Sequence, residues 1–143
     1  MNIIPMKKEH ADEVISMMNV FYHSPAVYTD GSNEIYRADV ENCINDSPYL
    51  EGYVFEEEGI ILGYSMLAKS FSTEFGKPCI WIEDIYLKPD YRDRGIGSKF
   101  ISFVSEKYSE AILRLEVEEE NERAVHVYQK SGFTKLPYVE MKK

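Results

Sequence analysis

The sequence predicts an α/β domain in which helices flank one mixed, mainly antiparallel sheet. Three observations lead to this prediction. First, 143 residues with 44% hydrophobic and 13% aromatic side chains are enough to bury a sizeable core. Second, the hydrophobic residues change from helical spacing to strand-like alternation and back again along the chain. Third, no repeat, low-complexity tract or linker divides residues 1–143, which we therefore expect to form a single domain.

The first third of the chain predicts a short strand and two helices. The strand, around Ile3–Ile4, is ended by Pro5. Apolar residues then recur at spacings of three and four, which predicts a helix with one apolar stripe. The stripe consists of Ala11, Val14, Ile15, Met18 and Phe21. After the loop "SPAVYTDGS", Ser32 is a suitable N-cap for a second helix from about Asn33 to Asp46.

The middle of the chain predicts three strands. The segments "LEGYVFEE" and "IILGYSMLAKSFS" flank a turn at Gly59, which is typical of a β-hairpin. The polar segment "STEFGKP" then separates this hairpin from a third strand, "CIWIEDIYL".

The last third predicts helices and strands in alternation. We expect a helix over about Ile96–Tyr108, a strand in "AILRLEVE", and a helix from about Asn121 that ends at Gly132. A closing strand is expected in "FTKLPYVEM", although Pro137 weakens it. The predicted order is β-α-α-β-β-β-α-β-α-β, with a parallel strand–helix–strand unit toward the end.

The charge and cysteine content exclude several classes of function. Sixteen basic and 25 acidic residues give a net charge of −9, which disfavours a nucleic-acid partner but is compatible with a cationic substrate. Cys43 and Cys79 show no metal-binding spacing, so we expect no metal, and a disulfide between them is not favoured. There is no signal-peptide pattern and no apolar run near the ~18 residues of a membrane span. We expect a cytoplasmic protein with no membrane partner.

The segment "YRDRGIGSKF" concentrates glycine and positive charge just before a predicted helix. From Lys88 to Lys99 there are four basic and two acidic residues, which is +2 within a −9 chain. The first turn of a helix offers unpaired N–H groups, and Gly95 and Gly97 would let that backbone curl around a ligand. With Arg92 and Arg94 as further donors, this pattern predicts a phosphate or pyrophosphate site. An ordinary turn with solvated arginines is the alternative.

The surroundings of this segment resemble the GNAT superfamily of acyl-CoA-dependent N-acetyltransferases. One signature of that family, [Q/R]-x-x-G-x-[G/A] after a "V/L-x-P-x-Y/F-R" turn, is matched by Leu87, Pro89, Tyr91, Arg92, Gly95 and Gly97. A second signature, N-x-x-A-x-x-x-Y-x-x-x-G-F, is matched by Asn121, Ala124, Tyr128, Gly132 and Phe133. The predicted order of elements is also that of the family, and the resemblance covers nearly the whole chain.

The resemblance implies acetyl-CoA as co-substrate, a homodimer, and a set of residues that bind the cofactor. These residues are Ile85, Tyr86, Leu87, Arg92, Asp93, Arg94, Gly95, Ile96, Gly97, Ser98, Asn121 and Tyr128. Asp93 departs from the family, in which many members have glycine, and should weaken the site unless it points to solvent or caps the helix. Asn121 is equally well explained as an N-cap.

Acetyl transfer from a thioester to an amine requires an acid for the leaving thiolate. The resemblance places Tyr128 beside the sulfur, and a phenol with a pKa of about 10 can donate a proton at neutral pH. Because Tyr128 shares a helical face with Ala124 and Val127, a purely structural role in the core is the alternative.

The amine must also lose a proton, for which Glu83 and Asp84 are candidates. Strict alternation places Trp81, Glu83, Ile85 and Leu87 on one face and Ile80, Ile82, Asp84 and Tyr86 on the other. We assign Glu83 as the base and Asp84 to substrate binding. A carboxylate held at the sheet rim by a basic residue is the alternative. A backbone N–H near Ile85–Leu87 would stabilise the oxyanion, in a slot opened by a bulge and by divergence from the next strand.

The acceptor is the least defined part of the prediction. The "IWIEDIYLKPDYRDRGIG" segment is similar to diamine acetyltransferases, and "EVEEENE" adds five acids that would attract a small cationic amine, unless they form a solvated charge run. Tyr28 lies in a loop expected to face this substrate. The predicted function is direct acetyl transfer to a primary amine. The alternatives are a protein or peptide N-acetyltransferase and a non-catalytic acyl-CoA sensor.

Overall fold

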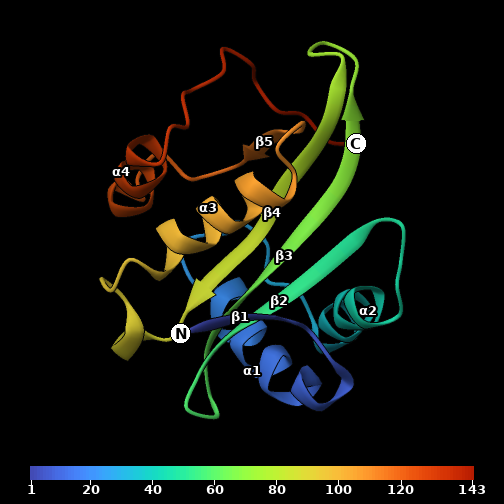
Figure 1. Ribbon diagram of the computed structural model, residues 1–143, viewed down its shortest axis with the longest axis vertical. Helices are drawn as coiled ribbons and strands as arrows, with labels where there is room; N and C mark the ends of the chain where they lie inside the picture. The colour runs from blue at the N-terminus through green and yellow to red at the C-terminus, as the bar shows by residue number, and fades with distance from the viewer.

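A computed structural model describes residues 1–143 and contains one five-stranded sheet with helices on both faces (Figure 1). The strands lie in the order in which they follow along the chain. They are β1 (Asn2–Pro5), β2 (Leu50–Glu57), β3 (Ile60–Ser72), β4 (Lys77–Leu87) and β5 (Ile112–Leu115). Neighbouring strands pair antiparallel except β4 and β5, which are parallel. The mixed sheet predicted from the sequence is confirmed.

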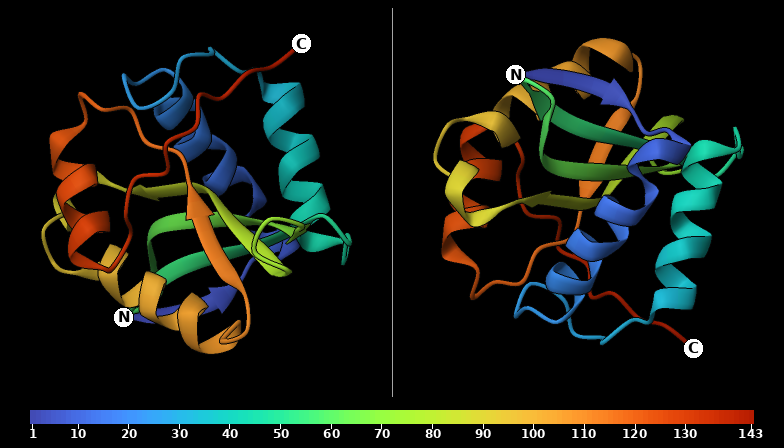
Figure 2. Two further views of the ribbon diagram at one scale, coloured as in Figure 1. Left: turned by 90° about the horizontal axis from the view of Figure 1, so that it is seen from above. Right: turned by 90° about the horizontal axis from the view of Figure 1, so that it is seen from below.

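The helices form two layers. They are α1 (Ala11–Tyr22), α2 (Asn33–Ile44), α3 (Ile96–Lys107) and α4 (Glu122–Lys130), with two short 3-10 turns at Lys8–His10 and Pro89–Tyr91. Figure 2 shows α1 and α2 on one face of the sheet and α3 and α4 on the other. None of these helices has the length and apolar content needed to span a bilayer.

The N-cap predicted for the second helix is confirmed. The Ser32 side chain accepts a 3.3 Å hydrogen bond from the backbone N–H of Ile35 and so caps α2. This helix ends at Ile44, two residues before the expected end at Asp46, which has a positive φ of 54°. Both cysteines are free.

The predicted closing strand is wrong. Residues 133–141 form no strand, and the sheet ends at β5, which is itself shorter than the predicted 111–118. Pro137 has no N–H to donate to a ladder. Val139 and Met141 are 89% and 88% exposed, so this segment also lacks the buried face that would fix a register.

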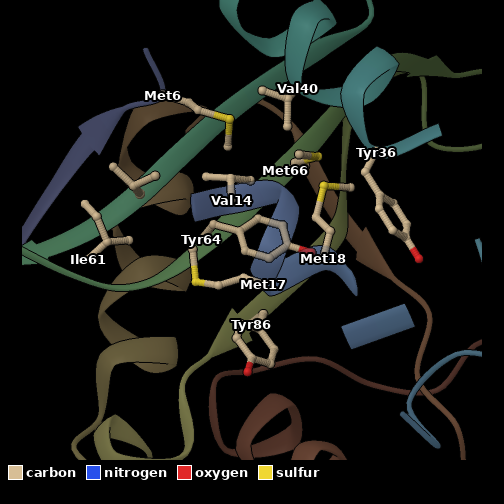
Figure 3. Packing of buried hydrophobic residues seen from close by; sticks show 11 residues of the cluster. Met6, Val14, Met17, Met18, Tyr36, Val40, Ile61, Tyr64, Met66 and Tyr86 are labelled. Atoms are coloured by element: carbon tan, nitrogen blue, oxygen red, sulfur yellow. The ribbon is translucent and has the colours of Figure 1, made fainter. Parts of the chain in front are cut away.

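Each face of the sheet has its own hydrophobic core. The side chains under α1 and α2 are shown in Figure 3 and include Met18, Tyr36, Tyr64, Met66 and Tyr86. The core under α3 includes Tyr53, Phe55, Leu67, Ile80, Ile82, Phe100 and Val104. Burial of each such side chain stabilises the fold by about 1.5–3 kcal/mol. Strand β4 contributes to both cores, which fixes its position.

A β-bulge in β4 changes which side chains face each core. Met66 on β3 pairs with Asp84, but the adjacent Leu67 pairs with Ile82, so Glu83 is an extra residue without a partner. Ile82 therefore faces the α3 core, whereas Asp84 and Tyr86 face α1 and α2. The predicted alternation, which placed Ile82 and Asp84 on one face, is wrong because the bulge reverses the pattern at Glu83.

Candidate active site

A cavity of about 670 Å³ opens where the ends of α1 and β4 meet the starts of α3 and α4. Every residue predicted to bind the cofactor lines it except Arg94, whereas Glu83, Asp84 and Tyr28 lie outside its lining. The lining residues are Val20, Phe21, Ser24–Ala26, Ile85–Leu87, Arg92, Asp93, Gly95–Ser98, Glu118, Glu120, Asn121, Arg123, Ala124, Val127 and Tyr128.

The first turn of α3 forms one end of the cavity. Gly95 is its N-cap residue and has a left-handed backbone, with φ 73°. The N–H groups of Ile96, Gly97 and Ser98 have no intrahelical acceptor, and the first turn carries no acidic residue. A Cβ placed on Gly97 would meet only the Ile85 side chain, at an ordinary 3.8 Å, so packing does not demand a glycine here. Its absence of a side chain leaves the amides open to an anion.

Of the two arginines in this segment, only Arg92 points to the cavity. Its Nε–H donates a 2.9 Å hydrogen bond to the Leu87 carbonyl, and its guanidinium lies 5.7 Å from the centre of the Tyr86 ring. The remaining guanidinium N–H groups stay available for a ligand. Arg94 instead lies 3.7 Å from Glu57 and does not line the cavity. The structure therefore does not bring Arg94 to the predicted site.

The unusual acid of the motif, Asp93, is neutralised from α4. Asp93 has a positive φ of 62°, and its carboxylate forms an ion pair with the Arg123 guanidinium. Both residues line the cavity, so the pair joins the loop before α3 to the first turn of α4. The role of Arg123 was not predicted, because nothing in the local sequence pattern shows that it faces Asp93.

Strands β4 and β5 separate at the middle of the cavity. Their pairing ends at Ile82 and Leu115, and the next residues of β4 lie open on that side. The N–H of Lys88 points to β3, where it donates to the Leu62 carbonyl at 2.9 Å. Since amide directions alternate along a strand, the N–H groups of Ile85 and Leu87 point away from β3 toward the cavity. The bulge and the divergence expected of a slot are both present.

Tyr128 lines the cavity opposite these amides. Its ring packs edge-on against Phe133 with the centroids 6.1 Å apart, at the edge of the α3 core. No protein group bonds its hydroxyl, and no buried side-chain oxygen lacks a partner, so the hydroxyl reaches solvent in the cavity. Burial raises the pKa of Tyr128 to about 12 and keeps the phenol protonated at neutral pH. The ring thus contributes to the core while its hydroxyl faces the cavity.

Asn121 combines the two roles that the sequence left open. Its side-chain oxygen accepts a 3.3 Å hydrogen bond from the Ala124 N–H and so caps α4. It also lines the cavity, and its NH₂ group is free of protein partners.

The paired acids of β4 lie in different environments. Asp84 is 3% exposed, and its two oxygens accept hydrogen bonds from the hydroxyls of Tyr22 at 2.7 Å and Tyr64 at 2.9 Å. Burial raises the pKa of Asp84, and the two tyrosines partly offset this rise. With both oxygens engaged and the residue enclosed, Asp84 presents no free acceptor to a substrate.

Glu83, on the bulge, is exposed at the side chain and forms no ion pair with a lysine or arginine. Partial burial raises its pKa, and the carboxylates of Asp84 and Glu140 raise it further. The expectation of a carboxylate held by a basic residue is therefore not met. Glu83 is the member of the pair that can accept a proton from outside.

The acidic residues that follow β5 do not all face the same part of the molecule. Burial, followed by the neighbouring Glu140 carboxyl, raises the pKa of Glu116 to about 7. Glu119 pairs with Lys135 at 2.8 Å, while Glu118 and Glu120 line the cavity. The run is thus not one continuous entrance.

Comparison with known proteins agrees with this geometry. The sequence profile of the Acetyltransferase (GNAT) family matches residues 14–133. A thialysine N-epsilon-acetyltransferase from Bos taurus is 41% identical over 83 residues, which are 56% of this chain and 48% of that protein. The enzyme of the same name from Sus scrofa is 33% identical over 120 residues, or 76% of this chain and 68% of that protein. The chain thus spans about half to two thirds of the curated relatives that it matches.

A solved structure shows the same fold. An aminoglycoside N-acetyltransferase in complex with CoA superimposes with a TM-score of 0.82 at 17% identity, over 99% of this chain and 93% of that one. The family profile covers most of the chain, and residues of both family motifs line the cavity, among them Arg92, Gly95, Gly97, Asn121 and Tyr128. The chain therefore belongs to the GNAT family of acetyl-CoA-dependent N-acetyltransferases.

Proposed function

We propose that the protein transfers an acetyl group from acetyl-CoA directly to a primary amine of a small cationic molecule. The observation that carries this proposal is the continuous cavity from the open amides of α3 to Tyr128. Acetyl-CoA supplies the acetyl group as an activated thioester. The residues along the cavity fit it: the first turn of α3 and Arg92 suit the pyrophosphate, and the edge of β4 suits the pantetheine arm.

In this proposal the chain supplies three groups to the reaction. Glu83 accepts the proton of the incoming ammonium, directly or through a water, and its raised pKa makes it a stronger base than an ordinary carboxylate. The N–H of Ile85 or Leu87 donates to the oxygen that becomes negative. Tyr128 donates its proton to the departing sulfur.

The electrostatics favour a cationic acceptor. The Glu140 carboxylate raises the pKa of both Glu83 and Glu116, and the charge of Asp84 raises that of Glu83 further. A cation would relieve this repulsion. The names of the relatives in two mammals point to the same class, since thialysine is a small molecule with primary amines. We also propose that the protein acts as a single-domain homodimer in the cytoplasm. The support for this part of the proposal is the sequence.

The test is an acceptor panel. The protein is incubated with acetyl-CoA and thialysine, lysine, spermidine, an aminoglycoside or a lysine-containing peptide, and release of free thiol is followed. We expect thiol release with one or more small cationic amines, and none with neutral amines of similar size. Turnover of the peptide alone would contradict the small-molecule acceptor. Binding of acetyl-CoA with no thiol release on any amine would contradict the enzyme.

A further inference from the structure

The chain after α4 runs as an extended strap (residues 134–143) across one end of the molecule. Figure 2 shows it passing the end of β5 and finishing beside the loop between α1 and α2. Three alternate side chains attach it. Tyr138 donates a hydrogen bond to Glu74, Glu140 lies near enough to Glu116 to raise its pKa, and Lys142 lies with its ammonium 5.5 Å from the centre of the Tyr28 ring. Between them, Val139 and Met141 are 89% and 88% exposed.

The strap passes near Glu83 on β4 and near the loop that carries Tyr28, the two elements proposed to flank the acceptor amine. Glu140 lies near enough to Glu83 to raise its pKa, and Glu83 sits two residues before the first cavity-lining residue of β4. Tyr28 follows Ala26 by two residues, and Ser24–Ala26 form a wall of the cavity. Two extended residues span about 7 Å, so the Lys142 backbone lies one such step beyond Glu140.

Lys142 carries the functional group on which the proposed reaction acts, namely a primary amine on a flexible four-carbon chain. Three of the eleven lysines are held by carboxylates: Lys88 by Glu13, Lys107 by Glu51 and Lys135 by Glu119. Lys142 forms no ion pair, and its only recorded partner is the exposed face of Tyr28. An exposed cation–π contact of this kind is weak and releases its amine easily.

We propose that Lys142 is an internal acetyl acceptor, so that the protein acetylates its own strap when no better amine is bound. This inference rests on the proposed function. The Lys142 nitrogen, after losing its proton to Glu83, forms a bond to the thioester carbonyl carbon while the carbon–sulfur bond breaks. Tyr128 supplies the proton that the departing CoA sulfur takes up, and the second proton of the attacking nitrogen, released as the amide forms, reprotonates Tyr128. The products are acetyl-Lys142 and free CoA, and no oxidant or further reactant is required.

Intact mass and peptide mapping of the protein incubated with acetyl-CoA alone test the proposal. We expect one acetyl group per chain, located on Lys142, formed at a rate that does not change when the protein is diluted. Positioning near the cavity should make Lys142 react about tenfold or more faster than the adjacent Lys143. Lys142→Arg should abolish the modification, whereas the matched variant Lys143→Arg should leave it unchanged. A small amine that serves as substrate should protect Lys142.

A second readout needs no cofactor. Lysines carrying ¹³C-methyl groups introduced by reductive methylation report their surroundings by NMR. The Lys142 resonance, identified by its loss in Lys142→Arg, should be shifted by the Tyr28 ring current and should move to the position of a free lysine in Tyr28→Leu.

Two results would overturn the inference. Lys142 modified no faster than Lys143, while added amines are acetylated, would refute the internal acceptor and leave the proposed function standing. A rate that rises with protein concentration would show transfer between molecules and refute the intramolecular step. If neither Lys142 nor any added amine is acetylated although acetyl-CoA binds, the proposed function fails together with this inference.

Discussion

The hydroxyl of Tyr22, at the end of α1, donates a 2.7 Å hydrogen bond to Asp84, the buried acid that follows the bulge in β4. This bond joins two walls of the cavity. On one side the preceding residue, Phe21, and the loop after α1 line it, and on the other side Ile85 does. Asp84 therefore holds the helix end against the strand, a role different from the predicted contact with substrate.

We predict that Tyr22→Phe destabilises the protein by about 1.5–3 kcal/mol, the range for loss of a hydrogen bond to a charged group. The variant keeps the ring contacts with Phe21 and Tyr36 but leaves one oxygen of Asp84 without its donor. Urea unfolding measures the change. Tyr28→Phe is the matched control, because Tyr28 is 72% exposed and its hydroxyl bonds nothing. Equal stability of the two variants would show that the buried bond contributes nothing.

The open amides of α3 lead to a prediction about cofactor affinity. Gly97→Asp should raise the Kd for acetyl-CoA about tenfold or more, equivalent to ~1.4 kcal/mol, because it places a negative side chain where the pyrophosphate is proposed to bind. The fold should tolerate the change, since a Cβ at this position meets no atom closer than 3.8 Å. Calorimetric titration with CoA measures the affinity.

Gly97→Ala is the control for the Gly97→Asp variant. It adds the same Cβ without the charge, so it should bind CoA more tightly than the aspartate variant and unfold at the same or a higher temperature. Full affinity in Gly97→Asp would mean that the pyrophosphate binds elsewhere.

Tyr128→Phe should lower kcat about tenfold or more and leave the affinity for acetyl-CoA nearly unchanged. The phenol has a pKa raised to about 12 by burial, so in the wild type it is protonated and able to donate at any ordinary assay pH. The ring contact with Phe133 is kept in the variant. Steady-state rates and CoA binding are measured side by side. An unchanged kcat would assign Tyr128 to the core alone.

The parts of the site that the sequence predicts are those encoded locally. Gly95 and Gly97 mark a helix start, and Asn121 and Tyr128 share one helix, so their spacing alone brings them to one cavity once the order of elements is known. A bulge was expected near Ile85–Leu87, but its position at Glu83 could not be read from the sequence because it arises from the register with Met66 and Leu67 on β3. Nothing within β4 itself signals the extra residue.

The positions of Arg94 and Arg123 were both predicted incorrectly or not at all, and for the same reason. Arg94 turns to Glu57 at the end of β2, and Arg123 reaches Asp93 across two elements. Both choices depend on which acid lies nearby in space, and a charge pattern along the chain does not contain that information. The closing strand failed for a related reason, since alternation in residues 133–141 cannot supply a partner strand.

Glu83→Gln should lower kcat/KM for the amine about a hundredfold, within the range for removal of a general base. In the wild type, kcat/KM should rise with pH through the raised pKa of Glu83, and this limb should disappear in the variant. The pH dependence of kcat/KM measures both effects.

Glu140→Gln tests how a neighbouring carboxylate affects the pKa of the proposed base, Glu83. The Glu140 carboxylate contributes to the raised pKa of Glu83, so its removal should move the acidic limb to lower pH while activity is kept. If Glu83→Gln keeps the wild-type limb, another group is the base.

The last prediction concerns stability as a function of pH. Burial and nearby carboxylates raise the pKa of Asp39 to about 6, and burial with the neighbouring Glu140 raises that of Glu116 to about 7. The unfolded chain loses these protons near its ordinary carboxyl pKa of about 4. Between about pH 4 and pH 7 the folded state therefore holds more protons than the unfolded state. The contribution of these two carboxyls to the free energy of unfolding is complete below about pH 4 and is lost as the pH rises through 6 to 7.

We therefore expect a higher free energy of unfolding near pH 5.5 than near pH 7.5, measured by urea titration at each pH. Asp39→Asn and Glu116→Gln should each flatten this dependence. Glu119→Gln is the control, since Lys135 lowers the pKa of Glu119 and its contribution is lost only in stronger acid, as the pH falls through that lowered value. A free energy of unfolding that stays constant or rises between the two pH values would mean that Asp39 and Glu116 titrate in the folded protein like ordinary exposed carboxylates.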